Sequence, residues 1–225
     1  MKGAPGAILR PLQERYLERL LPPRDPLLAE MEEVARGEGI PIADPEVGRF
    51  LEVMARATGA RRIVEVGTAI GYGTLCLARG APEARVVTID RDPGMLERAR
   101  GYLERGGVAQ RVELAAGEAL TVLEGLEPPF ELAWVDAAKV DYRRYLDRLM
   151  RLLPVGGTVL FDNLLWKGRL GEPPAEEDPA TEALLAFNPY LMIHPQLRAS
   201  LLPLGDGVGV AVKTRPVVLE MGGPF

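Results

Sequence analysis

Two short apolar stretches of this chain, FELAWV and GTVLF, each lead directly into an aspartate. Asp136 follows the first stretch, Asp162 and Asn163 follow the second, and the two aspartates are 26 residues apart. That spacing suits one strand–helix–strand unit. Such a unit would bring all three side chains to the carboxyl edge of one sheet, where open α/β folds bind ligands. Two carboxylates and an amide oxygen form a hard-oxygen set suited to Mg²⁺ or Ca²⁺.

A titratable amine accompanies these three side chains. Lys139 lies one helical turn after Asp136, and a lysine whose pKa is lowered by a nearby cation and by loss of water can accept a proton. Each residue has a simpler explanation when taken alone. An aspartate at a strand end is usually a cap or turn residue, and a lysine on a helix is usually solvated. Because all four groups converge on one sheet edge, we favour a functional site.

A glycine-rich stretch, EVGTAIGYG, follows the first predicted strand. Its glycines, Gly67, Gly71 and Gly73, let the backbone turn and approach a ligand closely, but their spacing does not match the GxGxxG pattern of dinucleotide-binding proteins. Asp90 ends the second predicted strand, 23 residues after Gly67, and an acidic residue there can hydrogen-bond both ribose hydroxyls. The combination favours an adenosyl ligand without a pyrophosphate and disfavours an NAD-dependent oxidoreductase.

Two residues near this stretch have alternative interpretations. Asp90 could cap the helix that follows it, although Asp92 is better placed to do so. Glu118 and Ala119 follow the third predicted strand and could approach an adenine ring. Glu118 is equally well explained as a carboxylate in the first turn of a helix, where the helix dipole favours negative charge.

The elements that would position these residues alternate along the chain. Helical periodicity at 10–21 and 25–38, and a third helix running from Asp44-Pro45 to Gly59, precede the sheet. Strands and helices then alternate, which predicts a doubly wound α/β fold with a mostly parallel sheet. The predicted strands are 62–66, 85–89, 111–115, 131–135 and 157–161, with helices between them that include 93–105 and 140–153.

Helical spacing also predicts which side chains face the core. In the third helix these are Val47, Phe50, Leu51, Met54 and Ala57. In the helix at 140–153 they are Tyr142, Tyr145, Leu146, Leu149, Met150 and Leu153.

The carboxyl-terminal part has a different pattern. Apolar runs at 198–204 and 208–213 flank Gly205-Asp206-Gly207, which is a hairpin signal. An antiparallel pair is therefore expected to close the sheet.

The length fits a single domain, which we expect to span residues 1–225. Within it we expect a helical amino-terminal segment at 1–58, a Rossmann-like core at 59–214, and an insertion at 164–190. The Pro, Gly and acidic residues of the insertion are typical of a surface loop, and its position directly after Asn163 suits a lid or a substrate wall.

Composition narrows the class of protein. The net charge of −5 argues mildly against a protein whose main task is to bind phosphate backbones. The single cysteine, Cys76, and the absence of a long apolar run or an apolar leader are typical of a cytoplasmic protein that does not enter membranes. His194 is the only histidine, so neither a Ser-His-Asp triad nor a zinc site of the usual kind is expected.

These motifs resemble one family. From about Pro41 to Lys213 the chain is similar to the cation-dependent, S-adenosylmethionine-dependent O-methyltransferases, the group that contains the catechol and caffeoyl-coenzyme A enzymes and bacterial relatives. The stretches that carry the resemblance, in order, are PEVGRFL, IVEVGTAIGYGTL, VVTIDRDP, FELAWVDAAK, FDNLLWKGRL and LPLGDGVGVAVK.

The resemblance implies a Rossmann-like, seven-stranded sheet with an antiparallel carboxyl-terminal strand, and a homodimer. It implies Asp136, Asp162 and Asn163 as ligands of Mg²⁺, or of another divalent cation such as Ca²⁺ or Mn²⁺, and Lys139 as the catalytic residue. The residues it implies around S-adenosylmethionine are Glu65, Gly67, Gly71, Tyr72, Gly73, Asp90, Glu118, Ala119 and Asp136.

The chain departs from the family pattern at two places. The family often has Asp-Ala-Asp-Lys where this chain has Asp136-Ala-Ala-Lys139, which removes a secondary acidic contact. A serine or threonine is common where Gly73 stands, and its loss removes a hydroxyl that could bond the methionine carboxylate.

The activity that the resemblance implies is methyl transfer to a hydroxyl of a catechol-like small molecule. The cation would lower the pKa of the hydroxyl and Lys139 would accept its proton. One alternative is a tRNA hydroxyuridine methyltransferase, for which Arg143, Arg144, Arg148 and Arg151 could form a basic surface; we regard tRNA as the less favoured partner. Another alternative is an adenosyl-binding module without catalytic activity.

Overall fold

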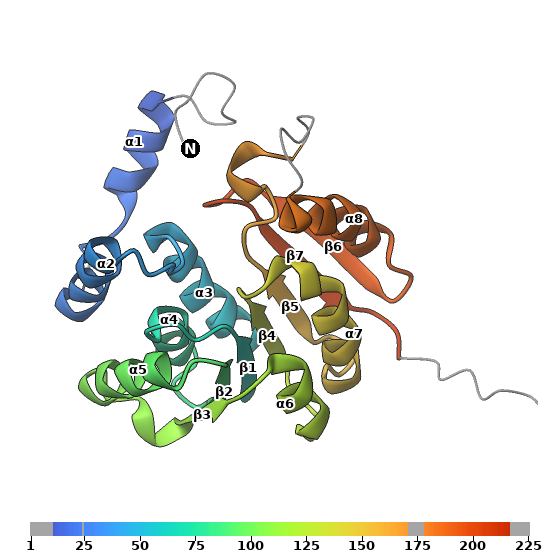
Figure 1. Cartoon of the computed structure of the whole chain (residues 1–225), viewed down its shortest axis with the longest axis horizontal. Coiled ribbons are helices and arrows are strands. Elements are labelled where there is room, and N and C mark those ends of the chain that lie inside the picture. Colours follow the sequence, from blue (N-terminus) through green and yellow to red (C-terminus); the bar gives the residue numbers. More distant parts are fainter. Residues whose placement is uncertain (1–10, 24, 171–177, 217–225) are drawn as a thin grey trace, which may run out of the picture.

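A seven-stranded sheet forms the centre of the protein (Figure 1). The computed structural model describes residues 11–23, 25–170 and 178–216. The strands are β1 (Arg62–Val66), β2 (Arg85–Asp90), β3 (Val112–Ala116), β4 (Leu132–Val135), β5 (Thr158–Phe161), β6 (Leu197–Leu202) and β7 (Val208–Lys213). Their order is β3-β2-β1-β4-β5-β7-β6. The first five strands pair in parallel, and β7 runs antiparallel to both of its neighbours. The predicted doubly wound fold and its closing hairpin are therefore confirmed.

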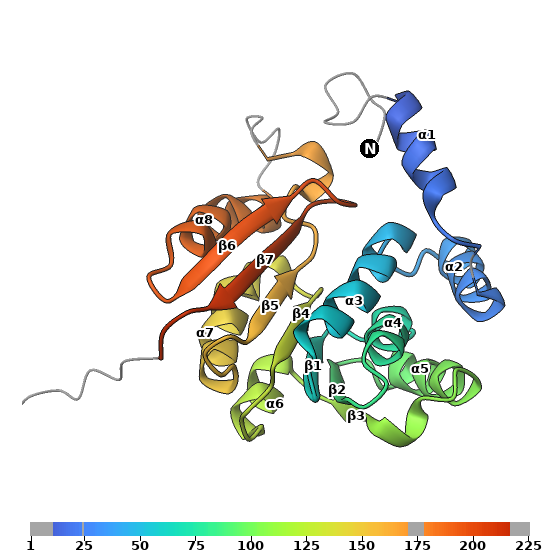
Figure 2. The same ribbon diagram turned by 180° about the vertical axis from the view of Figure 1, so that it is seen from behind.

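Helices cover both faces of the sheet, as the opposite views in Figures 1 and 2 show. One face carries α3 (Pro45–Thr58), α4 (Tyr72–Gly80) and α5 (Pro93–Arg105), and the other carries α6 (Ala119–Gly125), α7 (Tyr142–Leu152) and α8 (Pro179–Ile193). Three short 3₁₀ turns are η1 (Ala109–Arg111), η2 (Lys139–Asp141) and η3 (Trp166–Gly168). Within the described ranges, no helix is long and apolar enough to cross a membrane.

Burial on both faces explains the sequence of the central strands. Ile63, Val64 and Val66 of β1 have no exposed surface, as expected for a parallel strand covered on both sides. Helix α7 alternates instead at helical spacing: Leu146 and Leu149 are buried while Arg143 and Arg144 are exposed. This difference in period separates strands from helices in the sequence.

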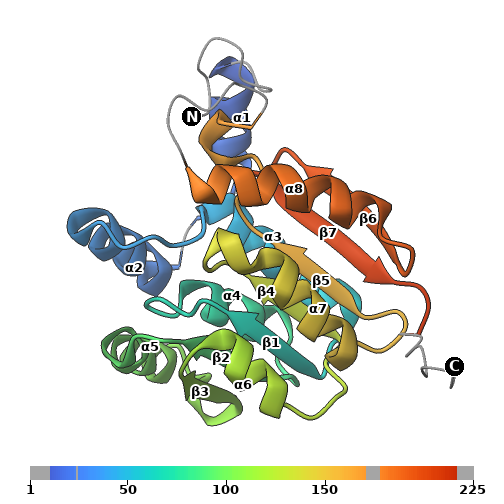
Figure 3. The same ribbon diagram turned by 45° about the vertical axis from the view of Figure 1, so that its right-hand side comes forward.

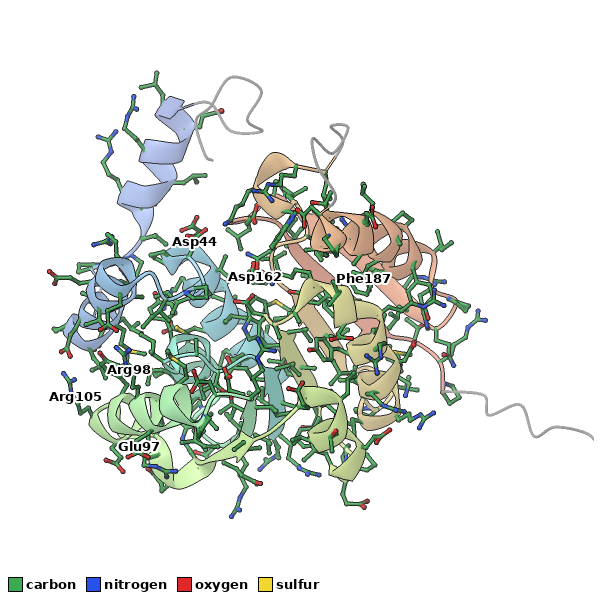
Figure 4. The ribbon with its side chains drawn as sticks, in the orientation of Figure 1. Asp44, Glu97, Arg98, Arg105, Asp162 and Phe187 are labelled. Atoms are coloured by element: carbon green, nitrogen blue, oxygen red, sulfur yellow. The ribbon has the colours of Figure 1, made fainter. Side chains whose placement is uncertain are left out.

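Two helices precede the sheet outside this layered core. Helix α2 (Pro26–Glu38) is joined to α5 by two bidentate ion pairs: Arg98 with Glu38 and Arg105 with Glu30. Figure 4 shows both arginines on the side of α5 that faces α2. Helix α1 (Pro11–Leu20) extends away from the body, which is also clear in Figure 3.

The expected core face of α3 was wrong at one position. Val47 and Leu51 are buried as expected, but Ala57 is exposed and Ala55 is buried in its place. The buried residues Val47, Leu51 and Ala55 are spaced four residues apart. At this face α3 lies very close to α4: a Cβ at Gly48 would be 2.8 Å from the ring of Tyr72. Tight helix packing of this kind is not encoded in apolar periodicity alone.

The carboxyl-terminal hairpin anchors α7. Lys213 of β7 is buried, and its Nζ donates hydrogen bonds to the carbonyl oxygens of Met150 (2.7 Å) and Leu153 (2.6 Å). These carbonyls belong to the end of α7, where main-chain acceptors lack helical partners. A cation from the last strand thus fixes the helix that begins at Tyr142.

Candidate active site at the carboxyl edge of the sheet

Two aspartates leave neighbouring strands at the same level. Strands β4 and β5 pair in parallel, with Val135 opposite Phe161, and each strand ends one residue before its aspartate. The main-chain NH of Asp162 donates to the carbonyl of Val135 at 3.0 Å. Asp162 is only 2% exposed, and Figure 4 places it centrally, between the start of α3 and the side of α8. The predicted juxtaposition of Asp136 and Asp162 is present.

The third oxygen donor follows immediately. Asn163 has a left-handed backbone with φ of 58°, and its NH donates to the Oδ1 of Asp162 at 2.7 Å. Left-handed geometry is tolerated by asparagine better than by most residues. The turn therefore redirects the chain directly after the aspartate.

The electrostatics of this group favour a cation. Burial raises the pKa of Asp162, and the negative charge of Asp136 raises it further. A buried carboxylate beside another carboxylate is stabilised by a positive charge or by a proton. Among the described residues, no group of three His, Cys, Asp or Glu side chains is placed to hold a metal ion; the amide of Asn163 is the candidate for a third protein ligand beside the two carboxylates.

Lys139 supplies a positive charge at the same place. Its Nζ lies 2.9 Å from Oδ1 of Asp136 and 2.7 Å from the hydroxyl of Tyr142. Only 8% of Lys139 is exposed, so it is not the solvated surface lysine that its position in a helical turn would suggest. The predicted neighbour of Asp136 is therefore buried within the site.

The glycine loop lies beside Asp136. Gly67 has φ of 99°, and a Cβ on it would overlap the main-chain carbonyl of Asp136. Gly71, with φ of 87°, turns the chain into α4. Both positions require glycine because the backbone is left-handed there, and at Gly67 there is also no room for a side chain.

Asp90 holds this loop in place. Its Oδ2 accepts hydrogen bonds from the NH groups of Thr68 (3.1 Å) and Ala69 (2.9 Å), and its Oδ1 accepts one from Asp92. Asp92 itself caps α5, so the alternative of a capping role for Asp90 is excluded. A carboxylate has about four lone-pair positions, which leaves capacity for a ribose hydroxyl.

Glu65 lies beneath the loop and is fully buried. Its Oε2 accepts hydrogen bonds from the hydroxyls of Thr74 and Thr88, whereas its Oε1 has no hydrogen-bond partner. Burial raises the pKa of Glu65 to about 8. A Cβ at Gly73 would lie 2.5 Å from Oε1, so this carboxyl occupies the space that a side chain at Gly73 would need.

The remaining predicted cofactor residues differ in their placement. The phenol of Tyr72 is buried and donates to Oε1 of Glu32 on α2 at 2.8 Å, so a cofactor contact is left only to its main chain. Ala119 begins α6 and is partly buried, and Glu118 before it is exposed and makes no side-chain capping bond. The NH of Gly117 donates to the carbonyl of Asp90, which brings this turn to the same edge.

Sequence reasoning missed the role of one residue, Tyr142. It was expected only on the core face of a helix. Its phenol is fully buried, contacts Lys139, and donates to the carbonyl of Asp162 at 3.0 Å. The signal that could have shown this is its spacing of three residues from Lys139.

Three of the arginines proposed as a basic surface have partners. Arg144 pairs with Asp141 at 2.8 Å, Arg148 pairs with Glu124, and the guanidinium of Arg143 lies over the ring of Tyr190. The two ion pairs reduce the positive potential that a phosphate backbone would meet.

Comparison with known proteins identifies the family. The model of the family described as O-methyltransferase matches residues 25–214. The chain belongs to the O-methyltransferase family. The catechol O-methyltransferase of Mycobacterium tuberculosis is 37% identical over 193 residues, covering 83% of this chain and 86% of that protein. A probable caffeoyl-CoA O-methyltransferase of Arabidopsis thaliana is 31% identical over 214 residues, covering 88% and 92%.

Structural similarity agrees. The crystal structure of an O-methyltransferase from Streptomyces achromogenes in complex with SAM has a TM-score of 0.80 at 29% identity, covering 91% of this chain and 96% of that one. The protein is therefore an enzyme that transfers a methyl group from S-adenosylmethionine, and an NAD-dependent oxidoreductase is excluded.

The raised pKa of Glu65 predicts a pH-dependent stability in the cofactor-free protein. Between pH 4.5 and about 8 the unfolded chain releases a proton that the folded chain keeps, so the free energy of unfolding falls as the pH rises through this window. The effect is on the order of a few kcal/mol. In Glu65→Gln this contribution is absent, so thermal melts should show the variant gaining stability relative to wild type from pH 5 to pH 8.

Glu113→Gln, an exposed position on β3, controls for the substitution itself. A constant difference in melting temperature between Glu65→Gln and wild type across this pH range would contradict the assignment.

Proposed function

We propose that the protein is a divalent-cation-dependent O-methyltransferase that acts on a hydroxyl of a catechol-like small molecule. The observation that supports this most strongly is the pair of strand-end aspartates, Asp136 and Asp162, with Nζ of Lys139 2.9 Å from Asp136. The glycine loop at Gly67 lies directly beside Asp136. A cation site next to a methyl-donor site is what activation of a hydroxyl for methyl transfer requires.

The donor set fits a hard divalent cation. Asp136, Asp162 and Asn163 would hold it through two carboxylates and one amide oxygen, and the charge that Asp136 imposes on buried Asp162 is what such an ion would balance. When bound, the ion supplies Lewis acidity that lowers the pKa of a coordinated hydroxyl. Three protein oxygens leave coordination positions for two oxygens of a vicinal diol, and the curated mycobacterial relative is named for catechol.

The residues of the chain then perform three tasks. Lys139 accepts the proton of the acceptor hydroxyl, with its Nζ held by Asp136 and Tyr142. The loop at Gly67, fixed by Asp90, binds the adenosyl group. Together these contacts hold acceptor oxygen and methyl carbon in line, so that a C–O bond forms as the C–S bond breaks.

The fit of S-adenosylmethionine depends on features that are already in place. The left-handed backbone at Gly67 brings the loop against the carbonyl of Asp136 with no side chain between them, and Asp90 retains acceptor capacity for ribose. The unpartnered Oε1 of Glu65 is a further acceptor at the start of α4. Glu118 and Ala119 remain proposals as adenine neighbours.

Other expectations also remain proposals. Exposed apolar side chains on α1, among them Leu12, Tyr16 and Leu20, are in keeping with a homodimer. We propose a cytoplasmic location, and a substrate-wall role for residues 164–170 at the start of the expected insertion at 164–190. Residues 171–177 lie outside the described residues, and residues 179–190 belong to α8, which covers the sheet. An adenosyl-binding module without activity is disfavoured because Asp136, Lys139 and Asp162 are in contact or close electrostatic interaction.

Substituting two strand-end carboxylates, one at a time, should distinguish residues that bind the cation from residues that bind the cofactor. Asp162→Ala should lower Mg²⁺-dependent turnover by about 100-fold because a cation ligand is lost, while calorimetric binding of S-adenosylhomocysteine stays within about threefold of wild type. Asp90→Ala should weaken that binding by about tenfold or more because the loop loses its anchor.

EDTA should abolish wild-type turnover and added Mg²⁺ should restore it. Full activity of Asp162→Ala, or of the EDTA-treated enzyme, would refute the metal assignment.

The acceptor class is tested by comparing labelled methyl transfer to catechols and to hydroxyuridine-containing tRNA. We expect transfer to a catechol, with little dependence on salt. Transfer to tRNA alone, with an affinity that falls steeply as salt rises, would favour the RNA enzyme instead.

A further inference from the structure

We propose that Tyr142 is a positioning residue that fixes the Nζ of Lys139 at the place where the acceptor hydroxyl would bind. The inference rests on the proposed function, in which Lys139 accepts a proton. It assigns to a fully buried phenol on α7 a role that goes beyond packing.

The Tyr142 hydroxyl donates its hydrogen bond to the main chain. The carbonyl oxygen of Asp162 lies 3.0 Å away, and that of Val135 lies at 3.4 Å. Carbonyl oxygens only accept hydrogen bonds, so the phenol must donate to one of them. The phenol oxygen therefore accepts a hydrogen bond from Nζ of Lys139, at 2.7 Å.

The lysine therefore has two fixed acceptors. Oδ1 of Asp136 lies 2.9 Å from Nζ, and the Tyr142 oxygen is the second. The two acceptors come from different elements, since Asp136 follows β4 and Tyr142 begins α7. Together they hold Nζ in one place at the carboxyl edge of the sheet.

In the proposed function the O–H bond of the acceptor breaks and its proton moves to Nζ, and a lysine that is already held in place needs no rearrangement for this step. Without the phenol, Nζ would keep only its contact with Asp136 and could move away from the acceptor. Orientation of a base in this way is a large part of its catalytic effect.

The ring of Tyr142 is itself held from two elements. Phe161 of β5 and Phe187 of α8 lie with ring centroids 5.4 and 5.6 Å from it, the second in an edge-on arrangement. Figure 4 shows Phe187 on the side of α8 that faces the sheet. Such aromatic contacts restrict the ring, so the hydroxyl stays between Lys139 and Asp162.

Steady-state kinetics of Tyr142→Phe with a catechol, S-adenosylmethionine and Mg²⁺ tests the proposal. We expect kcat to fall by about 10- to 100-fold, while both KM values and the Mg²⁺ activation constant stay within about twofold of wild type. Tyr145→Phe, which removes a phenol hydroxyl from the same helix one turn away, is the matched control and should keep the wild-type kcat.

A double-mutant cycle shows whether the hydroxyl acts through the lysine. In a Lys139→Ala background, whose residual turnover depends on the cation, Tyr142→Phe should cause no further loss. Phe187→Leu loosens the ring without touching the hydroxyl, and it should lower kcat by a smaller factor at constant KM. This second variant tests the proposal even if Tyr142→Phe is poorly folded.

Three results would overturn the inference: unchanged kcat in Tyr142→Phe, an additive loss in the Lys139→Ala background, or a defect confined to the Mg²⁺ activation constant. The last would mean that the phenol positions Asp162 rather than Lys139. Failure of the wild-type enzyme to methylate any catechol is a distinct result, because it refutes the proposed function itself.

Discussion

Repulsion between two carboxylates at the ends of adjacent strands is the constraint on which the rest of the site depends. Parallel pairing of β4 and β5 fixes Asp136 and Asp162 at one level, and burial of Asp162 makes their charges costly to hold together. The chain compensates with the ammonium of Lys139 against Asp136. A divalent cation would compensate both carboxylates at once, which is why an acidic pair in this position favours a metal-dependent reaction.

The cofactor side and the cation side are joined through the same strand ends. Gly67 is in such close contact with the carbonyl of Asp136 that no side chain fits between them, and Asp90 fixes the loop that carries Gly67. Tyr142 joins Lys139 to the main chain of Asp162. A shift of either strand by one residue would therefore disturb the proposed methyl-donor site, the proposed base and the proposed cation ligands together.

Strand ends were predictable from the sequence, whereas side-chain partners were not. Asp136, Asp162, Asn163 and Asp90 follow directly from where apolar stretches stop, because parallel strands present their carboxyl ends at one edge. The burial of Lys139 depends on Tyr142 and Asp136 meeting it in three dimensions. The phenol of Tyr72 turns toward Glu32 because α2 packs there, and no local pattern encodes that contact. Likewise, the apolar run at 198–204 suggested a longer strand, but β6 ends at Leu202, where the hairpin loop begins.

The most direct test of this account is the position of the ion itself. Crystals grown with S-adenosylhomocysteine and Mn²⁺ should give one strong anomalous peak at coordination distance, roughly 2 Å, from side-chain oxygens of Asp136, Asp162 and Asn163. The Nζ of Lys139 should lie next to the open coordination positions. A fully occupied cofactor site with no anomalous peak at these three residues, or with the peak elsewhere, would contradict the central claim.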